Sequence, residues 1–182
     1  GALAKHMTNY EKRIGQRDMS ETVFDAFQAR KHALIEAETG TGKSLAYLLP
    51  ALYEAVKPDK RVVVSTYTTQ LQTQLLEEEI PLLKKIAPMP FDAAILKGRN
   101  HYLSLERFSY ELEHSEHDNY DVALTKAILL VWLTETVTGD IDEIHLPTSG
   151  YHFFNRISAE SERKLDVTSP WFRYSYYTRA KK

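Results

Sequence analysis

The sequence predicts an α/β fold with parallel strands in its first part and a mostly helical second part. Up to about residue 97, short apolar runs alternate with longer segments of helical periodicity. This alternation is typical of parallel strands joined by helices. After residue 97, helical patterns and a long stretch without a convincing period follow. We therefore expect two parts, residues 8–98 and 99–182, after a tag remnant at residues 1–7 (GALAKHM).

The first predicted elements are a helix, a strand, a loop and a second helix. Residues 20–30 place three apolar side chains on one helical face. Residues 32–37 (HALIEA) form a short, mainly apolar run, which predicts a buried strand. A glycine-rich loop over 38–43 leads into residues 44–56, where leucines recur at helical spacing. Pro50 lies inside that pattern and is expected to bend the helix.

A turn, a second strand and helix, and a third strand come next. Residues 57–60 (KPDK) predict the turn. Residues 61–65 (RVVVS) are rich in β-branched side chains, which favours a buried parallel strand. Residues 69–86 carry apolar side chains at helical spacing, and two prolines end that pattern. Residues 91–96 are the third strand candidate.

The second part is predicted to be helical over 100–114 and 120–136. The second of these helices is very apolar around residues 129–133. The segment 106–121 carries six acidic residues against one basic residue. From residue 139 to residue 170 no period is convincing, and the histidines of the second part show no metal-ligand spacing.

The composition excludes several classes of protein. The chain has 182 residues and no cysteine, which excludes disulfides, thiolate zinc sites, a cysteine nucleophile and a cysteine-held iron–sulfur cluster. The formal net charge is −2, so any contact with nucleic acid requires a local patch. The longest apolar run has seven residues, far short of the roughly 20 that a membrane helix needs. Since no signal peptide is evident, we expect a cytoplasmic protein without a membrane partner.

Residues 37–44 (AETGTGKS) match the phosphate-binding loop known as Walker A, between a predicted strand and a predicted helix. Gly40 and Gly42 allow backbone N–H groups to turn toward phosphate oxygens. Lys43 can reach the β- and γ-phosphates and is the expected catalytic residue, and the Ser44 hydroxyl can ligate Mg²⁺. An ordinary glycine turn is the structural alternative. The predicted nucleotide-binding residues of this loop are Thr39, Gly40, Thr41, Gly42, Lys43 and Ser44.

Gln16 is a candidate for recognising the base of a nucleotide. It lies 27 residues before Lys43 and precedes the first predicted helix. A glutamine amide can read adenine through paired hydrogen bonds to N6 and N7. Considered alone, a surface glutamine is more often simply solvated, so this assignment depends on the wider pattern.

Residues 65–72 (STYTTQLQ) follow the second predicted strand and open the next helix. Hydroxyl and amide side chains at this place suit contacts to a nucleic-acid phosphate backbone. Thr66, Thr68 and Gln72 are the candidates. The alternative is an ordinary helix N-cap formed by Thr68 or Thr69, and the local sequence does not separate the two interpretations.

Two patterns in the second part favour a structural interpretation. Asp142, Glu143 and His145 spell the D-E-x-H form of a Walker B box, but a turn-like segment precedes them instead of a hydrophobic strand. Residues 171–182 interleave aromatic and basic side chains, as single-strand-binding surfaces do. Packing of these aromatics into the core of the second part is the favoured alternative.

Four segments together resemble the DinG family of bacterial DNA helicases, the bacterial branch of the XPD-like superfamily-2 helicases. They are YEKRIGQRDM, ALIEAETGTGKSLAYLLPAL, VVVSTYTTQLQTQLL and LKGRNHYLSLERF. The resemblance covers nearly all of residues 10–182. It implies a partial RecA-like ATP-binding domain followed by a helical insertion. It also implies an ATP- and Mg²⁺-dependent helicase that acts on single-stranded DNA in repair.

The resemblance also implies roles for individual residues. Gln16 would read adenine, and Lys43 and Ser44 would contact the nucleotide and Mg²⁺. The residues that it places on single-stranded DNA are Thr66, Thr68 and Gln72. One alternative is a P-loop nucleotide-binding switch or NTPase that does not bind nucleic acid. Another is a non-catalytic module in which residues 100–170 bind a protein partner.

The second part resembles the family's insertion, which in many members holds a four-cysteine iron–sulfur cluster. Ser104, Ser169 and Ser175 stand where three of those cysteines would be, and the remaining one has no obvious counterpart. Serine does not hold iron as a thiolate does, so we expect no cluster. The sequence leaves open whether these serines are natural or engineered. Members without the cluster often carry an exonuclease domain ahead of the helicase part.

The family's chain continues beyond the last motif found here, into a DEAH box and a second RecA-like domain. Later strands of the family's sheet lie between its first two, so we expect this chain to lack the middle of its own sheet. The missing strands would come from the rest of the parent chain, or exposed strand edges would drive self-association. Because hydrolysis needs carboxylates for Mg²⁺ and water, we expect weak or no catalysis from this chain alone.

Overall fold

The computed structural model describes residue 11, residues 13–160 and residues 168–180. The chain divides into two compact units, one ending at Ile95 and the other beginning at Leu96. We call them unit 1 and unit 2. The sequence pattern predicted this boundary after residue 98. Each unit is described by itself, and the tag remnant expected at residues 1–7 lies outside the described residues.

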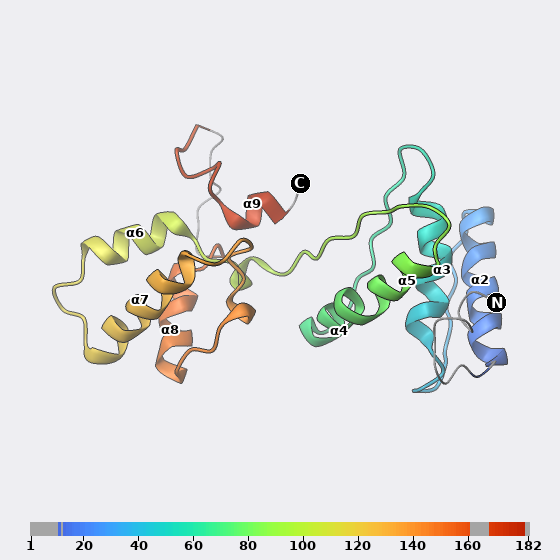
Figure 1. The fold of residues 1–182 in the computed structure, drawn as a ribbon, viewed down its shortest axis with the longest axis horizontal. Helices are drawn as coiled ribbons and strands as arrows, with labels where there is room; N and C mark the ends of the chain where they lie inside the picture. The colour runs from blue at the N-terminus through green and yellow to red at the C-terminus, as the bar shows by residue number, and fades with distance from the viewer. Residues whose placement is uncertain (1–10, 12, 161–167, 181–182) are drawn as a thin grey trace. The chain divides into compact units, whose positions relative to one another are not determined.

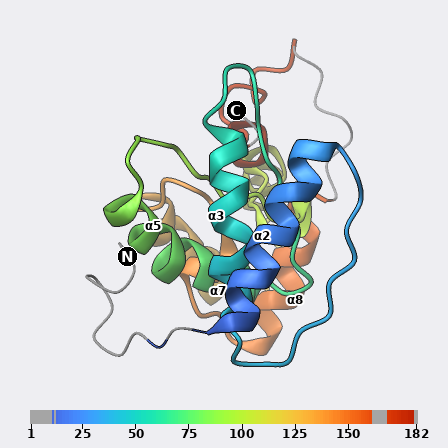
Figure 2. The same ribbon diagram turned by 90° about the vertical axis from the view of Figure 1, so that its right-hand side faces the viewer.

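Unit 1 consists of helices joined by long loops (Figure 1). Its elements are α2 (Ile14–Ala29), α3 (Lys43–Ala55), α4 (Thr69–Gln74), η1 (Leu75–Glu79) and α5 (Ile80–Ile86). Helices α2 and α3 lie side by side in both views (Figure 1; Figure 2). The leucine stripe of α3 packs against the helix that runs from α4 to α5. The buried residues of this small core are Leu45, Leu48, Leu75 and Leu83.

The three predicted strands do not form a sheet in the described part of the chain. Residues 32–37, 61–65 and 91–96 have no strand assignment, and neither of the two described β-bridges lies within them. Leu34 and Val63, which were expected to be buried, are 103% and 88% exposed. The prediction of parallel strands is therefore not confirmed, because a strand is stable only when neighbouring strands bond its N–H and C=O groups.

Unit 2 is mostly helical, as the sequence predicted. Its elements are η2 (Arg99–His101), α6 (Leu105–Glu113), α7 (Tyr120–Leu133), η3 (Ile141–Glu143), α8 (Thr148–Ile157) and α9 (Tyr176–Ala180). Helices α6 and α7 fall within the ranges 100–114 and 120–136, whereas α8 lies in a stretch where no period was recognised. Two isolated antiparallel bridges, Tyr102 with Asp140 and Leu103 with Ser158, join the start of the unit to its later loops.

The core of unit 2 lies where α8 packs against α6 and α7. Phe108, Leu129, Phe154 and Ile157 are each no more than 2% exposed. Gly139 has a left-handed φ of 67°, and a Cβ built there would lie 2.2 Å from the Tyr176 ring. Only glycine therefore allows α9 to pack against this loop. No described helix has the length and apolar character needed to cross a membrane.

Candidate nucleotide-binding site

The glycine-rich loop of unit 1 turns at two glycines just before helix α3 begins. Gly40 and Gly42 have φ values of 79° and 77°, in the left-handed region that other residues rarely adopt. Gly42 is the N-cap of α3, and the helix begins at Lys43. The first N–H groups of a helix have no intrahelical partner, so the loop presents donors and the positive end of the helix dipole.

The side chains of Lys43 and Thr41 donate hydrogen bonds to backbone carbonyls of the same loop. The Lys43 ammonium donates to the carbonyl oxygens of Ala37 and Glu38, at 2.9 and 2.7 Å. The Thr41 hydroxyl donates to the same Glu38 oxygen at 2.9 Å. Three donated bonds therefore converge on two adjacent carbonyls. They keep the cationic group at the loop, where an anionic phosphate would meet it.

The structure brings Gln16 from the start of α2 to this loop. Its Nε2 donates to the Gly42 carbonyl at 2.9 Å, and Arg13 donates to the carbonyl of Gly40. The approach is close, because a Cβ at position 42 would lie 2.2 Å from Gln16 Nε2. The sequence pattern selected Gln16. It missed Arg13, which carried no signal beyond its place in the same segment.

Ser44 forms a hydrogen bond with Tyr47, a partly buried residue that the sequence pattern did not indicate as part of the site. Burial raises the pKa of the Tyr47 phenol, and its hydrogen bond with Ser44 offsets part of that rise. Glu79, on η1, adds its charge to this environment. Burial and the neighbouring Glu78 carboxylate raise the pKa of Glu79 above its usual value. Tyr47 lies outside the leucine stripe of the sequence, and its partly buried ring packs against the small core of unit 1.

The predicted nucleic-acid-binding residues lie together at the start of α4. The Thr68 hydroxyl accepts a hydrogen bond from the Leu71 N–H at 3.2 Å and is the N-cap of the helix. The Thr66 hydroxyl donates to the Thr68 carbonyl at 3.1 Å. Gln72 lies half-buried within the helix. The capping interpretation therefore describes Thr68 in this structure, although a capping hydroxyl keeps a proton to donate.

In unit 2, the segment that spells a Walker B box has structural partners instead. Asp142 lies in η3 and forms an ion pair with Lys97 at 2.8 Å. The Glu143 carboxylate accepts hydrogen bonds from Trp132 Nε1 at 2.9 Å, Thr136 Oγ1 at 2.6 Å and the Thr138 hydroxyl. Burial raises the pKa of Glu143, but these three bonds lower it further, to below its usual value.

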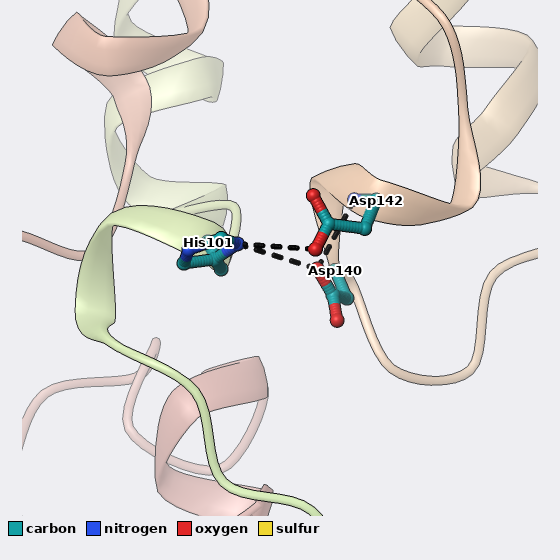
Figure 3. Close-up of side chains that lie close together, drawn as sticks. All are labelled: His101, Asp140 and Asp142. Carbon is teal, nitrogen blue, oxygen red and sulfur yellow. Dashed lines mark hydrogen bonds and ion pairs between the residues drawn. The ribbon is translucent and has the colours of Figure 1, made fainter. Parts of the chain in front are cut away.

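His101 lies beside Asp140 and Asp142, although it is far from both of them in the sequence (Figure 3). His101 Nδ1 lies 3.4 Å from a carboxylate oxygen of Asp142 and 4.0 Å from one of Asp140. This set has the composition of a metal site, which the histidine spacing did not indicate. However, the Lys97 ammonium lies 2.5 Å from Asp140 and its side chain is only 5% exposed. That ammonium already occupies the place of a cation, so the cluster is an ion-pair network around the buried Lys97.

The three serines at the predicted cysteine positions all accept backbone hydrogen bonds. Ser104 is 1% exposed and caps α6, with its Oγ 3.3 Å from the Arg107 N–H. Ser169 and Ser175 accept from the N–H groups two and three residues ahead, each at 3.3 Å. Hydroxyl oxygens are good caps, whereas sulfur is a weak acceptor. Serine at these three positions therefore stabilises the local backbone through its hydroxyl oxygen.

Comparisons with known proteins agree with the loop geometry. The family model described as DEAD/DEAH box helicase matches residues 17–127. The 3'-5' exonuclease DinG of Bacillus subtilis is 50% identical over 161 residues, which are 88% of this chain and 17% of that protein. The protein of the same name from Staphylococcus epidermidis is 41% identical over 147 residues, 79% of this chain and 16% of that protein. The chain thus spans about a sixth of the length of these relatives.

Proposed function

The chain belongs to the DEAD/DEAH box helicase family, and we propose that it is the ATP-binding segment of a DinG-type helicase. The complete protein would use ATP to move along single-stranded DNA during repair. The observation that carries the proposal is the glycine-rich loop, with left-handed Gly40 and Gly42 and with Gln16 bonded to Gly42. An ordinary glycine turn does not need a glutamine from another helix bonded to it, so this contact favours a binding site.

The loop residues would each contact a different part of the nucleotide. N–H groups from Thr39 to Ser44 would donate to phosphate oxygens, and Lys43 would exchange its carbonyl partners for the β- and γ-phosphates. The Ser44 hydroxyl is a hard oxygen ligand at the start of α3, which fits Mg²⁺ held between protein and phosphate. Gln16, already fixed against Gly42, would read adenine with its amide.

We assign DNA contacts to Thr66, Thr68 and Gln72. Thr68 is exposed beside the N-terminus of α4, and a helix N-terminus favours phosphate. The exonuclease activity named for the relatives is assigned to another part of the longer protein. Nucleases of the two-metal type need open carboxylate sites, and among the described residues the His101 cluster is filled by Lys97. An iron–sulfur cluster is not part of the proposal, since the chain has no cysteine.

One observation favours a second candidate, a P-loop NTPase or switch that does not bind nucleic acid. The N-cap bond of Thr68 accounts for a hydroxyl at that position without DNA. The two candidates differ in their response to Thr66→Ala and Gln72→Ala in the full-length protein. A helicase loses DNA-stimulated ATP hydrolysis, whereas a switch keeps its full activity.

The direct test is ATP binding and turnover by this chain, with and without single-stranded DNA, beside Lys43→Ala. We expect the wild-type chain to bind ATP with Mg²⁺, and Lys43→Ala to weaken binding at least about tenfold. We expect little turnover, because Asp142 and Glu143, the pair that spells a Walker B box, already have structural partners in unit 2. Equal ATP binding by both proteins would contradict the assignment of the loop.

A further inference from the structure

Helix α7 in unit 2 exposes a continuous apolar stripe. Its members recur at spacings of three and four residues, which places them on one side of the helix. We call this stripe the α7 outer face. It consists of Tyr120, Ala123, Leu124, Ala127, Leu130 and Val131. Tyr120 is 79% exposed and Val131 is 66% exposed, while Leu129 and Trp132 on the opposite side are buried. A helix that is apolar on both sides is typical of one that is covered on both sides.

Carboxylates border the α7 outer face at both ends. Glu116 and Asp121 are exposed at its N-terminal end, and Glu135 is exposed just beyond its C-terminal end. Between Glu116 and Glu135 the sequence contains one lysine and no arginine. That residue, Lys126, is 4% exposed and forms an ion pair with Asp118 at 2.6 Å. The outer face therefore presents apolar side chains between two negative ends, without an exposed lysine or arginine.

We propose that the α7 outer face binds an amphipathic helix of a partner protein, whose apolar stripe carries lysine or arginine at both ends. Asp121 and Glu135 are 14 positions apart, which corresponds to about 21 Å along a helix. The basic residues of the partner are therefore about four helical turns apart. The apolar stripe supplies the binding energy of a helix-on-helix contact, and the paired charges fix its register.

The carboxylates at both ends of the α7 outer face disfavour a second copy of this chain, DNA or an anionic lipid surface as its partner. A second copy of this chain, packed in either direction, sets acidic ends against acidic ends, because both ends of the stripe carry carboxylates. DNA and anionic lipid surfaces are also negative and are repelled. The α7 outer face is therefore distinct in chemistry from any surface that contacts a phosphate backbone.

The test uses two synthetic peptides of about 18 residues, long enough to span the face. Both carry leucines at helical spacing and a fluorescent label; one has lysine pairs at its ends, and the other has glutamate pairs. We expect the lysine-ended peptide to bind the chain in fluorescence anisotropy, and Val131→Asp to weaken it about tenfold or more. Val63→Asp is the matched control, because Val63 is an 88% exposed valine in unit 1. It should leave binding unchanged.

A charge exchange tests the chemistry of the partner separately. Glu135→Lys should weaken the lysine-ended peptide and strengthen the glutamate-ended one, since it reverses the sign at one end of the face. Equal binding of both peptides to the wild-type chain would overturn the proposal, as would binding unaffected by Val131→Asp. Self-association abolished by Val131→Asp, without peptide binding, would instead identify a second copy as the occupant. Because both positions are exposed, circular dichroism should show unchanged folding of each variant.

Discussion

Gly42 is the residue on which the loop geometry depends most directly. Its φ of 77° and the 2.2 Å approach of Gln16 leave no room for a side chain. We expect Gly42→Ala to strain the backbone by about 1–2 kcal/mol, to displace Gln16 and to weaken ATP binding about tenfold or more. Titration with a fluorescent ATP analogue measures this.

Gly15→Ala is the matched control for that substitution. Position 15 lies in α2 beside Gln16, and a Cβ there meets no atom within 4 Å. Its affinity for the analogue should equal that of the wild type, and its helix should gain up to about 1 kcal/mol. If Gly42→Ala also binds normally, the left-handed backbone and the contact with Gln16 have no part in nucleotide binding.

The sequence predicted the loop residues because their chemistry is local. A glycine pattern, a lysine and a serine in one run identify a phosphate loop without knowledge of the fold. Glu79 and the cluster around His101 could not be found in this way, because their neighbours come from distant parts of the chain. Gln16 lies between these cases. Its contact with Gly42 spans 26 residues, and only the family resemblance connected the two segments.

Among the elements, helices were predicted better than strands for a physical reason. A helix satisfies its backbone within one segment, whereas a strand depends on neighbours. The predicted helix 69–86 is present, but η1 (Leu75–Glu79) interrupts it as a π-turn. Pro81 follows that turn and has no N–H to donate. A hydrophobic period does not reveal this local change in hydrogen bonding.

The ion-pair network that joins Lys97 to η3 is expected to stabilise unit 2. Burial lowers the pKa of Lys97, but its bonds to Asp140 and Asp142 raise it further, to above its usual 10.5. Lys97→Met would leave the 7% exposed Asp140 without its cation, at a cost of about 3–5 kcal/mol. Urea unfolding followed by tryptophan fluorescence reports on unit 2 alone, because both tryptophans lie there. Lys85→Met, an exposed lysine of α5, should leave that transition unchanged.

Glu143 makes the same part of unit 2 sensitive to acid. Its carboxyl pKa is lowered from the usual 4.5. A lowered pKa stabilises the fold above pH 4.5, and this contribution disappears as the pH falls through the folded-state value. We expect the Tm of the wild type to fall more steeply than that of Glu143→Gln as the pH is lowered from about 6 to about 3. Parallel curves for the two proteins would mean that this carboxylate does not contribute to acid unfolding.

For the whole molecule, the main consequence of the structure is that the strand segments predicted in unit 1 form no sheet among the described residues. Leu34 and Val63 are 103% and 88% exposed, although their β-rich sequences are typical of buried strands. Exposed apolar strands pair readily with other strands. The relatives are about five times as long as this chain. We therefore propose that a longer chain of this family supplies the neighbouring strands.

This arrangement predicts concentration-dependent self-association of the isolated chain. Unpaired strand segments from two copies can bond each other, which buries Val63 and its neighbours. We expect light scattering to show a rising mass with concentration, and Val63→Lys to shift the midpoint to about tenfold higher concentration. The same substitution on α7, Val131→Lys, should leave that midpoint unchanged, since the acidic ends of the α7 outer face disfavour its pairing with a second copy. If only Val131→Lys lowers the mass, association runs through unit 2, and the exposed segments of unit 1 do not pair between copies.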